Sequence, residues 1–363
     1  MTDQNKGDRA TDGMVDYNAN STAQQQNALR NAGVISDLAA RVAKTTETLT
    51  FADFGCGPGQ STIETVRPAL DIWRQRVPEK SIAVCHADQP GNDWNALIGL
   101  IQGDSGYAND ANAPLVMTSV GSFYERMMPV GSVSLATCFF ASHWLNGPVQ
   151  LTAPDTLWFA DLTGAARGAM WTRARSDWAL FLRQRAKELQ PGGYLYVSAL
   201  GAIPETDEIN GTAAAGRTLY RTMQEVTAGM VDDGLLDRQV ADRFVFGLWF
   251  LTAREARESI EADPELSQLY EIDTVEVITV APGDIFAGSA ADPQDYARRY
   301  TGYTRAFAAS TLRTHLFAPS AGETMSADRL EQMFFDRYEA IYRERTSALA
   351  LEQWLLEVIL RRK

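Results

Sequence analysis

The residues of this chain that could most clearly do chemistry lie in and around a glycine-rich segment, Gly55-Cys-Gly-Pro-Gly59, which directly follows the apolar run 49–54. Glycines in such a loop let the main chain approach a ligand closely, and the helix that follows offers N–H groups without partners. Asp53 stands two residues before the first glycine, and Asp88 follows the next apolar run. Two carboxylates at the ends of neighbouring strands, beside a glycine loop, predict a site for a nucleotide-type cofactor.

The spacing of the glycines separates two classes of cofactor. A dinucleotide loop has the pattern G-x-G-x-x-G, and its third glycine would stand at position 60, which is Gln60. A loop for S-adenosylmethionine (SAM) instead carries an acid two residues before the first glycine, where it can meet the ammonium group, and Asp53 fits that position. Asp88 can then accept hydrogen bonds from the ribose hydroxyls. We therefore expect SAM, and we keep as alternatives a nicotinamide oxidoreductase and a structural glycine turn in which Asp88 caps the next helix.

The elements that must position these residues alternate along the first 200 residues. Apolar runs predict strands at 49–54, 81–88, 116–120, 133–140 and 194–200. Helical periodicity predicts helices at 22–43, from about 60 to 76, and at 93–103 and 165–190. We expect Ser61 and Thr62 to cap the second helix. Strands that alternate with helices predict an α/β fold with a mostly parallel sheet, a Rossmann-like core of the SAM-dependent methyltransferase type.

Beyond residue 203 the pattern becomes mostly helical, with Gly247 as the main interruption in 211–263 and strand character returning at 270–280 and 354–360. The economical interpretation is one core with two helical insertions over the carboxyl edge of its sheet. We expect a disordered tail at 1–13, a core formed by 14–203, 268–285 and 350–363, and a helical cap over the active site formed by 204–267 and 286–349.

Composition and charge exclude several classes of partner. The chain has 363 residues and a formal net charge of −13, which argues against nucleic acid and anionic membranes because both attract basic surfaces. Its three cysteines and three histidines show no metal-ligand spacing, so we expect no metal. No apolar run is long enough to span a membrane, and the N-terminal segment lacks the apolar region of a signal peptide, so we expect a cytoplasmic protein.

Further motifs occur in an order that points to one family. The N-terminal motif is Tyr17-Asn-Ala-Asn20-Ser21-Thr-Ala-Gln24, and it is followed by Gly91-Asn-Asp-Trp-Asn95, Gly121-Ser-Phe-Tyr124 and Ser142-His-Trp144-Leu145. Residues 176–200, and Gly234-Leu235 with Phe244, continue the pattern. Together they resemble the SABATH methyltransferases, which methylate salicylate, benzoate and jasmonate carboxyl groups and include the N-methyltransferases of the caffeine pathway.

The resemblance implies the positions that hold the cofactor. It places Ser21, Asp53, Gly55 and Cys56 against the methionine part of SAM, Asp88 and Gln89 at the ribose, and Ser122 and Phe123 beside the adenine. The complete cofactor set that we expect is Tyr17, Ser21, Asp53, Gly55, Cys56, Gly57, Ser61, Asp88, Gln89, Ser122 and Phe123. The product would be S-adenosylhomocysteine (SAH).

The resemblance also implies how a small carboxylic acid is held. Gln24 and the indole of Trp144 would grip its carboxylate as the catalytic pair, and no general base is expected. The substrate pocket would be formed by Phe140, His143, Tyr220, Trp249 and Phe307. The family further favours a homodimer.

The sequence departs from the plant members at three places. Gly57 stands where they usually have serine, and Ser61 where they usually have asparagine, so the glycine loop is nearer to the general SAM type. The proline-flanked tyrosine stretch of the family is replaced by Gly247-Leu-Trp249-Phe-Leu251, which has neither proline. The sequence therefore leaves open whether the acid is aromatic, isoprenoid or aliphatic.

Methyl transfer to a carboxylate suits neutral donors such as Gln24 and Trp144. A carboxylate is already ionised at pH 7, so it needs no base, and its charge fades as the methyl group arrives. An arginine would stabilise the ground state more strongly and slow the step. We therefore expect a SAM-dependent O-methyltransferase that converts a small apolar acid to its methyl ester. The alternatives are N-methylation of a heterocycle and a non-catalytic ligand binder; His143 is expected to shape the pocket only, and Cys56 has no apparent base to make it a nucleophile.

Overall fold

A seven-stranded sheet forms the centre of the computed structural model, which describes residues 22–43, 48–204, 213–280 and 284–363. The expected tail and the candidate residues Tyr17 and Ser21 lie outside these residues. The strands are β1 (Thr48–Phe54), β2 (Ser81–Asp88), β3 (Leu115–Val120), β4 (Val133–Phe139), β5 (Leu189–Leu200), β8 (Tyr270–Thr279) and β9 (Trp354–Arg362). Their spatial order is β3-β2-β1-β4-β5-β9-β8. The strand β9 runs antiparallel to both β5 and β8, and the other neighbouring pairs are parallel. The mostly parallel α/β sheet predicted from the sequence is confirmed.

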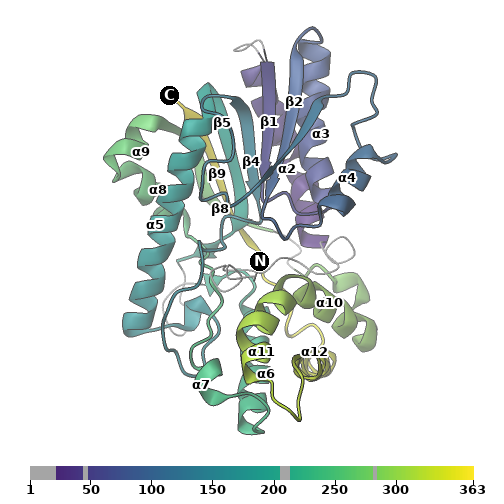
Figure 1. The fold of residues 1–363 in the computed structure, drawn as a ribbon, viewed down its shortest axis with the longest axis vertical. Helices are drawn as coiled ribbons and strands as arrows, with labels where there is room; N and C mark the ends of the chain where they lie inside the picture. Colours follow the sequence, from purple (N-terminus) through teal and green to yellow (C-terminus); the bar gives the residue numbers. More distant parts are fainter. Residues whose placement is uncertain (1–21, 44–47, 205–212, 281–283) are drawn as a thin grey trace.

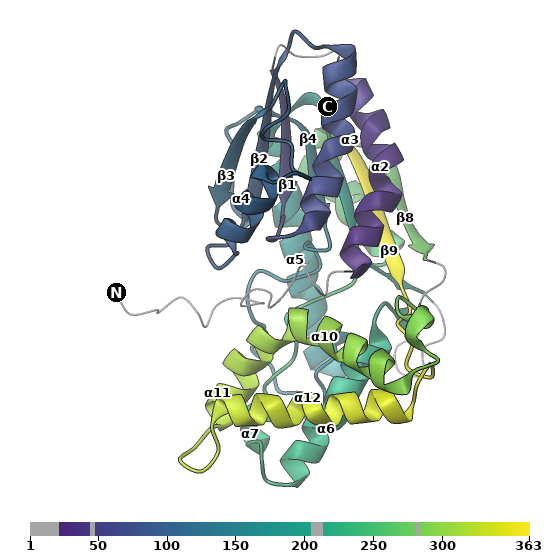
Figure 2. The same ribbon diagram turned by 90° about the vertical axis from the view of Figure 1, so that its right-hand side faces the viewer.

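Helices cover both faces of the sheet (Figures 1 and 2). One face carries α2 (Thr22–Val42), α3 (Gln60–Arg76) and α4 (Trp94–Gln102), and the other carries α5 (Gly164–Glu188), α8 (Ala253–Glu261) and α9 (Pro264–Leu269). The alternation of side chains along β1 explains this burial on both sides. Leu49 and Phe51 pack with the α2–α3 layer, while Ala52 and Phe54 belong to the core on the α5 side.

The remaining helices gather beyond one end of the sheet, below it in Figure 1. They are α6 (Arg217–Asp232), α7 (Arg238–Ala241), α10 (Pro293–Leu312), the short α11 (Ala318–Ser320) and α12 (Ala327–Glu344). The expected cap segment 204–267 extends too far along the chain, because α8 and α9 pack against α5 and β8 at the side of the sheet. Their periodicity shows an apolar face but does not identify the element that this face meets.

Two local expectations are wrong. Gly59 occupies the N-cap position of α3 without a side-chain bond, and Ser61 and Thr62 lie inside the helix, where the Thr62 hydroxyl donates to Asp53 instead. The expected helical stretch 211–263 is interrupted by an irregular segment from 242 to 252. There the main chain pairs with another loop, since the Leu145 N–H donates to the Gly247 carbonyl at 2.8 Å.

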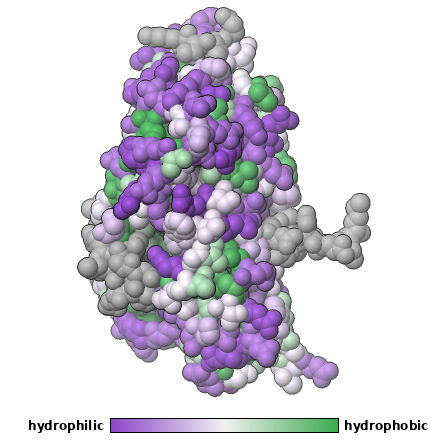
Figure 3. Space-filling model, turned by 90° about the vertical axis from the view of Figure 1, so that its left-hand side faces the viewer, coloured by the Kyte–Doolittle hydropathy of each residue, from purple (hydrophilic) through white to green (hydrophobic). Residues whose placement is uncertain are grey.

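One face of the molecule shows how hydropathy is distributed over the described part of the surface. Figure 3 shows one face of the molecule, on which hydrophilic residues dominate and hydrophobic ones are scattered. No helix of the described ranges is long and apolar enough to cross a membrane.

Candidate active site

The glycine loop joins β1 to α3 in a conformation that requires glycine. Gly55 has a φ of +75° and Gly57 a φ of +59°, which side-chain-bearing residues rarely adopt. A Cβ atom at Gly55 would lie 2.3 Å from the Cβ of Ala141, which follows β4. The loop is therefore packed directly against the segment that continues from β4.

Asp53 lies buried beneath this loop. Its side chain is engaged by two hydroxyls: Thr137 donates to Oδ1 at 2.7 Å, and Thr62 of α3 donates to Oδ2. Burial raises the pKa of Asp53 to about 6, and the two hydroxyl bonds only partly oppose that rise. A carboxylate with this pKa favours a cationic ligand, because a nearby positive charge would restore its ionised form.

A chain of hydrogen bonds extends from Asp53 into the protein interior. Because the Thr62 hydroxyl donates to Asp53, its oxygen must accept from Nδ1–H of His86, 3.2 Å away. Nε2 of His86 then lacks a proton and accepts the hydroxyl proton of Tyr107. Burial lowers the pKa of His86 to about 4, so the imidazole is neutral, as this chain of donors requires. This series of hydrogen bonds fixes the direction in which the Thr62 hydroxyl points, so that it donates to Asp53.

Asp88 ends β2 and organises the other side of the glycine loop. Its carboxylate accepts the N–H groups of Gly57 and of Gln89, each at 2.7 Å. Burial raises the pKa of Asp88. The alternative in which Asp88 caps the next helix is wrong, since Asp93 caps α4 by accepting the Ala96 N–H at 3.0 Å.

The turn after β3 brings Ser122 and Phe123 to the same place. A Cβ atom at Gly55 would lie 4.0 Å from the ring of Phe123. The Gly121 N–H donates to the Asp88 carbonyl at 2.9 Å, and the Ser122 hydroxyl accepts the Tyr124 N–H at 3.2 Å. The expected cofactor residues of β1, β2 and β3 therefore surround one loop at the carboxyl ends of their strands.

A cavity lies between the core and the cap helices. Its walls are Gln24, Phe140, His143, Trp144, Leu200, Gly216, Leu219, Tyr220, Tyr303, Phe307 and Leu351. Six of these are the expected carboxylate-gripping and substrate-pocket residues, namely Gln24, Phe140, His143, Trp144, Tyr220 and Phe307. Among the residues that the structure describes, no charged side chain lines the cavity, and most of its wall is aromatic or aliphatic.

Three polar atoms of the wall have no hydrogen-bond partner among the described residues. They are Nε1 of Trp144, Oε1 of Gln24 and Nδ1 of His143. Burial lowers the pKa of His143 to about 3, so its imidazole is neutral. A buried N–H without a partner costs free energy, which an acceptor in the cavity would recover. The wall therefore offers neutral hydrogen-bonding groups to a ligand with an apolar body.

The segment after β4 connects this cavity to the glycine loop. Phe140 has a φ of +52°, unusual for a large side chain, and its ring lines the cavity. The next residue, Ala141, packs on Gly55. Such backbone strain occurs often at functional sites. Here it lies directly before Ala141, which contacts the glycine loop, and Trp144 follows three residues later.

Trp249 does not line the cavity, in contrast to the expectation for it. Its indole is 4.9 Å from the ring of Phe159, with the Arg167 guanidinium 5.2 Å from its centroid. Its expected place rests on the family resemblance, and the sequence departs from the family in this stretch, Gly247–Leu251, which lacks both flanking prolines and is irregular in the structure. Cys56 is 4% exposed and burial raises the pKa of its thiol, which disfavours a reactive thiolate.

Five wall residues are missing from the sequence-based set: Leu200, Gly216, Leu219, Tyr303 and Leu351. Leu200 and Tyr303 carried a usable signal. Leu200 ends a parallel strand at the edge where ligands bind, and Tyr303 lies one helical turn before Phe307. Leu351 lies near the C-terminal end of the chain and reaches the cavity only through tertiary packing, so no local pattern indicates it.

The described residues contain no group of three histidine, cysteine, aspartate or glutamate side chains that could hold a metal ion. The site consists of a glycine loop flanked by two acids and of an uncharged cavity whose wall residue Phe140 directly precedes Ala141, the residue that meets Gly55. This arrangement can hold a cationic, nucleoside-containing cofactor beside an apolar acceptor molecule.

Known proteins are similar to this chain in sequence and in fold. A family model described as SAM dependent carboxyl methyltransferase matches residues 4–363. Anthranilate O-methyltransferase 3 of Zea mays is 25% identical over 292 residues, 74% of this chain and 75% of its own length. Gibberellic acid methyltransferase 1 of Arabidopsis thaliana is 24% identical over 290 residues, 71% of this chain and 72% of its own. The solved structure of a loganic acid methyltransferase with SAH covers 96% of both chains at a TM-score of 0.73 and 19% identity, which shows the shared fold.

Proposed function

The chain belongs to the family of SAM-dependent carboxyl methyltransferases, and on that premise we propose that its cavity holds the carboxylate of a small apolar acid against Gln24 and Trp144. The enzyme transfers the methyl group of SAM to a carboxylic acid and releases the methyl ester and SAH. The observation that carries the proposal is the buried indole N–H of Trp144, which has no partner among the described residues and lines an uncharged cavity, three residues after the Ala141 that packs on the glycine loop.

The residues of the glycine loop fit the cofactor. Gly55 and Gly57 keep the loop free of side chains at the point of approach, and the buried carboxylate of Asp53 suits an ammonium group. We assign the ribose hydroxyls to Asp88, whose carboxylate oxygens have lone pairs beyond those that accept N–H groups. Gln89, Ser122, Phe123 and Cys56 complete the described part of the set. Tyr17, Ser21 and Ser61 join it on the strength of the resemblance.

The chain's own residues position the acceptor and do not transfer protons. When bound, the cofactor supplies an electrophilic methyl group on a sulfonium centre. The acid arrives ionised, since its pKa is near 4, so no base is needed, and the neutral imidazole of His143 fills the wall. The indole N–H of Trp144 and the Gln24 amide orient the carboxylate. Because both are neutral, they resist the loss of its charge less than an arginine would.

The composition of the cavity indicates the class of acid. Phe140, Tyr220 and Phe307 present flat apolar surfaces to the cavity, as the walls of many small-molecule sites do. We infer an aromatic or isoprenoid-like acid. The names of two relatives, which cite anthranilate and gibberellic acid, agree with both classes. We also infer a cytoplasmic homodimer, for which the support is the family resemblance, and sedimentation at micromolar concentration measures the oligomeric state.

A methyl-transfer screen tests the proposal. Wild-type enzyme and SAM with a labelled methyl group are incubated with aromatic, isoprenoid and aliphatic acids, and with heterocyclic nitrogen acceptors. We expect ester formation with an aromatic or isoprenoid acid. Turnover of heterocycles alone would favour N-methylation, and SAM binding without turnover of any acceptor would favour a non-catalytic binder.

Two substitutions test the carboxylate contact on the acid that the screen identifies. Trp144→Phe and Gln24→Ala should each lower kcat/KM for the acid by about tenfold or more, because a hydrogen bond to a charged group is lost, while the Kd for SAH changes less than about twofold. Trp178→Phe is the matched control, since Trp178 is also a buried tryptophan whose N–H has no partner but does not line the cavity. Wild-type activity in both site variants would refute the contact.

A further inference from the structure

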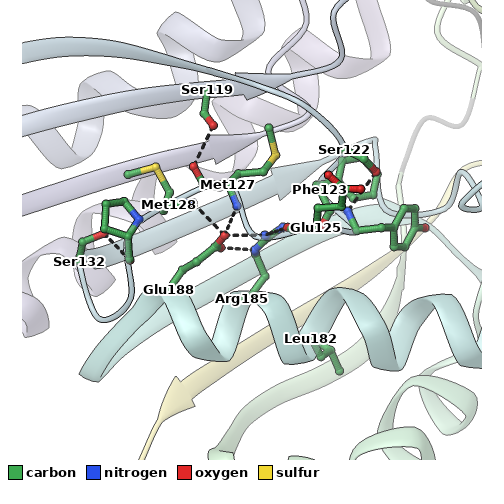
Figure 4. A network of polar contacts seen from close by, with 12 residues as sticks. Ser119, Ser122, Phe123, Glu125, Met127, Met128, Ser132, Leu182, Arg185 and Glu188 are labelled. Carbon is green, nitrogen blue, oxygen red and sulfur yellow. Dashed lines mark hydrogen bonds and ion pairs between the residues drawn. The ribbon is translucent and has the colours of Figure 1, made fainter. Parts of the chain in front are cut away.

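The loop from Ser122 to Met128 is held on its inner side by two charged residues of α5 (Figure 4). Arg185 is fully buried, and its guanidinium donates to the Phe123 carbonyl at 2.7 Å and to the Glu125 carbonyl at 2.9 Å. The same guanidinium lies 3.9 Å from the ring centroid of Phe54. Arg185 therefore contacts both Phe54, at the end of β1, and the loop that carries Phe123.

Glu188, one turn further along α5, completes the anchor. Its carboxylate receives Nε of Arg185 at 2.6 Å, and it also accepts the N–H groups of Met127 and Met128 at 2.5 and 3.0 Å. Every polar group of this ion pair thus faces either its partner or the main chain of one loop. A buried ion pair is costly to desolvate, so its full engagement here indicates that it fixes the shape of the loop.

Tyr124 extends from the anchored loop toward the acceptor cavity. Its hydroxyl donates to the main-chain carbonyl of Trp144 at 2.5 Å, and the side chain is 5% exposed. Its ring lies 4.8 Å from that of Phe123, its neighbour in the chain. One short segment therefore connects the residue assigned to the adenine with the residue assigned to the carboxylate.

We propose that Tyr124 is a positioning residue that couples the cofactor site to the indole of Trp144, and that the Arg185–Glu188 pair holds the loop through which this coupling acts. The proposal rests on the proposed function, which assigns Phe123 to the cofactor and Trp144 to the acid. The physical basis of the coupling is the stiffness of the segment formed by Phe123, Tyr124 and the loop that carries them. Phe123 and Tyr124 share a peptide bond and a ring contact, and the loop behind them is fixed by four charge-assisted hydrogen bonds, so a ligand that immobilises Phe123 also immobilises the hydroxyl on Trp144.

Hydrogen exchange of the full chain, with and without SAH, measures the coupling without knowledge of the acid. In the wild type, SAH should slow exchange in peptides over the glycine loop, 55–62, and also over 141–147. Tyr124→Phe removes only the hydroxyl. We expect it to keep the SAH effect at 55–62 and to reduce the effect at 141–147 by about fivefold or more, the lower end of typical coupling between sites.

Tyr270→Phe is the matched control. The hydroxyl of Tyr270 is also buried and also donates to a main-chain carbonyl, that of Leu182 at 2.8 Å, but it lies away from the cavity. This variant should keep the SAH effect in both peptides. An unchanged SAH effect at 141–147 in Tyr124→Phe, or no such effect in the wild type, would overturn the proposed coupling. Failure of SAH to protect 55–62 in the wild type would instead contradict the assigned cofactor site.

The role of the ion pair has its own test. Arg185→Lys keeps the charge but cannot reach Glu188 and two carbonyls in one plane, so we expect the Kd for SAH to rise by about tenfold. Arg183→Lys is the control, because Arg183 is a partly exposed residue of the same helix that pairs with Asp263 and Glu265. An equal Kd for SAH in both variants and the wild type would exclude the anchoring role. If Arg185→Lys does not fold, Glu188→Gln, which keeps the shape but replaces one of the two acceptor oxygens with an NH2 donor and removes the charge, provides the same comparison.

Discussion

At the scale of single residues, Asp53 shows how the candidate site is maintained at a cost in stability. Its pKa is raised by burial from an ordinary value of 3.8 to about 6, so the folded protein binds a proton more tightly than the unfolded chain does. This difference destabilises the fold by about 3 kcal/mol above pH 6, and the cost disappears as the pH falls below 4. A ligand with a positive charge would compensate for it.

Asp53→Asn should therefore stabilise the protein and abolish its function. The amide keeps the size of the side chain without a charge, so we expect a gain of about 1–3 kcal/mol in the free energy of unfolding at pH 8 and a much smaller gain at pH 4.5. Urea unfolding at the two pH values measures this difference. The variant should also lose detectable SAH binding by calorimetry. A loss of stability at pH 8 would show that the burial of the charge is compensated within the protein.

The residues of the site differ in how visible they are from the sequence. Gln24 and Trp144 are found because their motifs match a family pattern, although a buried tryptophan after a strand is also typical of a core. The structure gives Trp144 both properties, since it is 6% exposed and lines the cavity. Thr62 and His86 are not found, because their bonds to Asp53 and Tyr107 depend on which strands become neighbours.

At the scale of elements, the glycine loop is the part of the site that tolerates least change. We expect Gly55→Ala to lose SAH binding and to destabilise the fold by about 3 kcal/mol or more, because a positive φ adds to an overlap with Ala141. The control is Gly131→Ala, where φ is +63° but nothing lies within 4 Å of the added Cβ, so only about 1 kcal/mol should be lost. Chemical denaturation measures both variants, and equal losses would show that the contact with Ala141 is unimportant.

The elements themselves are predicted well wherever one pattern dominates. The strands of the parallel sheet appear as short apolar runs because both of their faces are buried, and this signal needs no knowledge of the fold. The expected helical stretch 211–263, in which Gly247 is the main interruption, includes the irregular segment 242–252. Its carbonyls and N–H groups bond to distant loops, as between Phe246 and Leu157 at 3.1 Å. Such pairing is set by tertiary packing and has no local signature.

At the scale of the whole molecule, the net charge of −13 repels an anionic substrate, whereas the cavity that binds it is uncharged. The acid must approach a negatively charged protein before it reaches neutral donors. We expect kcat/KM for the acid to rise about twofold when salt is increased from about 10 to 150 mM, because screening weakens the repulsion. Initial rates at low acid concentration measure this change. A fall in kcat/KM with salt would indicate a basic group that guides the acid.

The division into core and cap is only partly visible from the sequence. Alternation of strands and helices predicts the core, and loss of that alternation predicts that the later helices lie elsewhere. The sequence does not show that α8 and α9 return to the sheet beside α5. It also does not show that cap residues such as Tyr303 line the same cavity as Gln24 of the core, since the two residues lie almost 280 residues apart in the chain.

The central claim is that an uncharged indole N–H from the core orients a carboxylate in this cavity. A crystal structure with SAH and the acid found in the screen tests it most directly. The account predicts that a carboxylate oxygen lies within hydrogen-bond distance of Nε1 of Trp144 and faces the sulfur of SAH. An acid whose carboxylate binds a charged side chain, or lies outside the cavity, would contradict it.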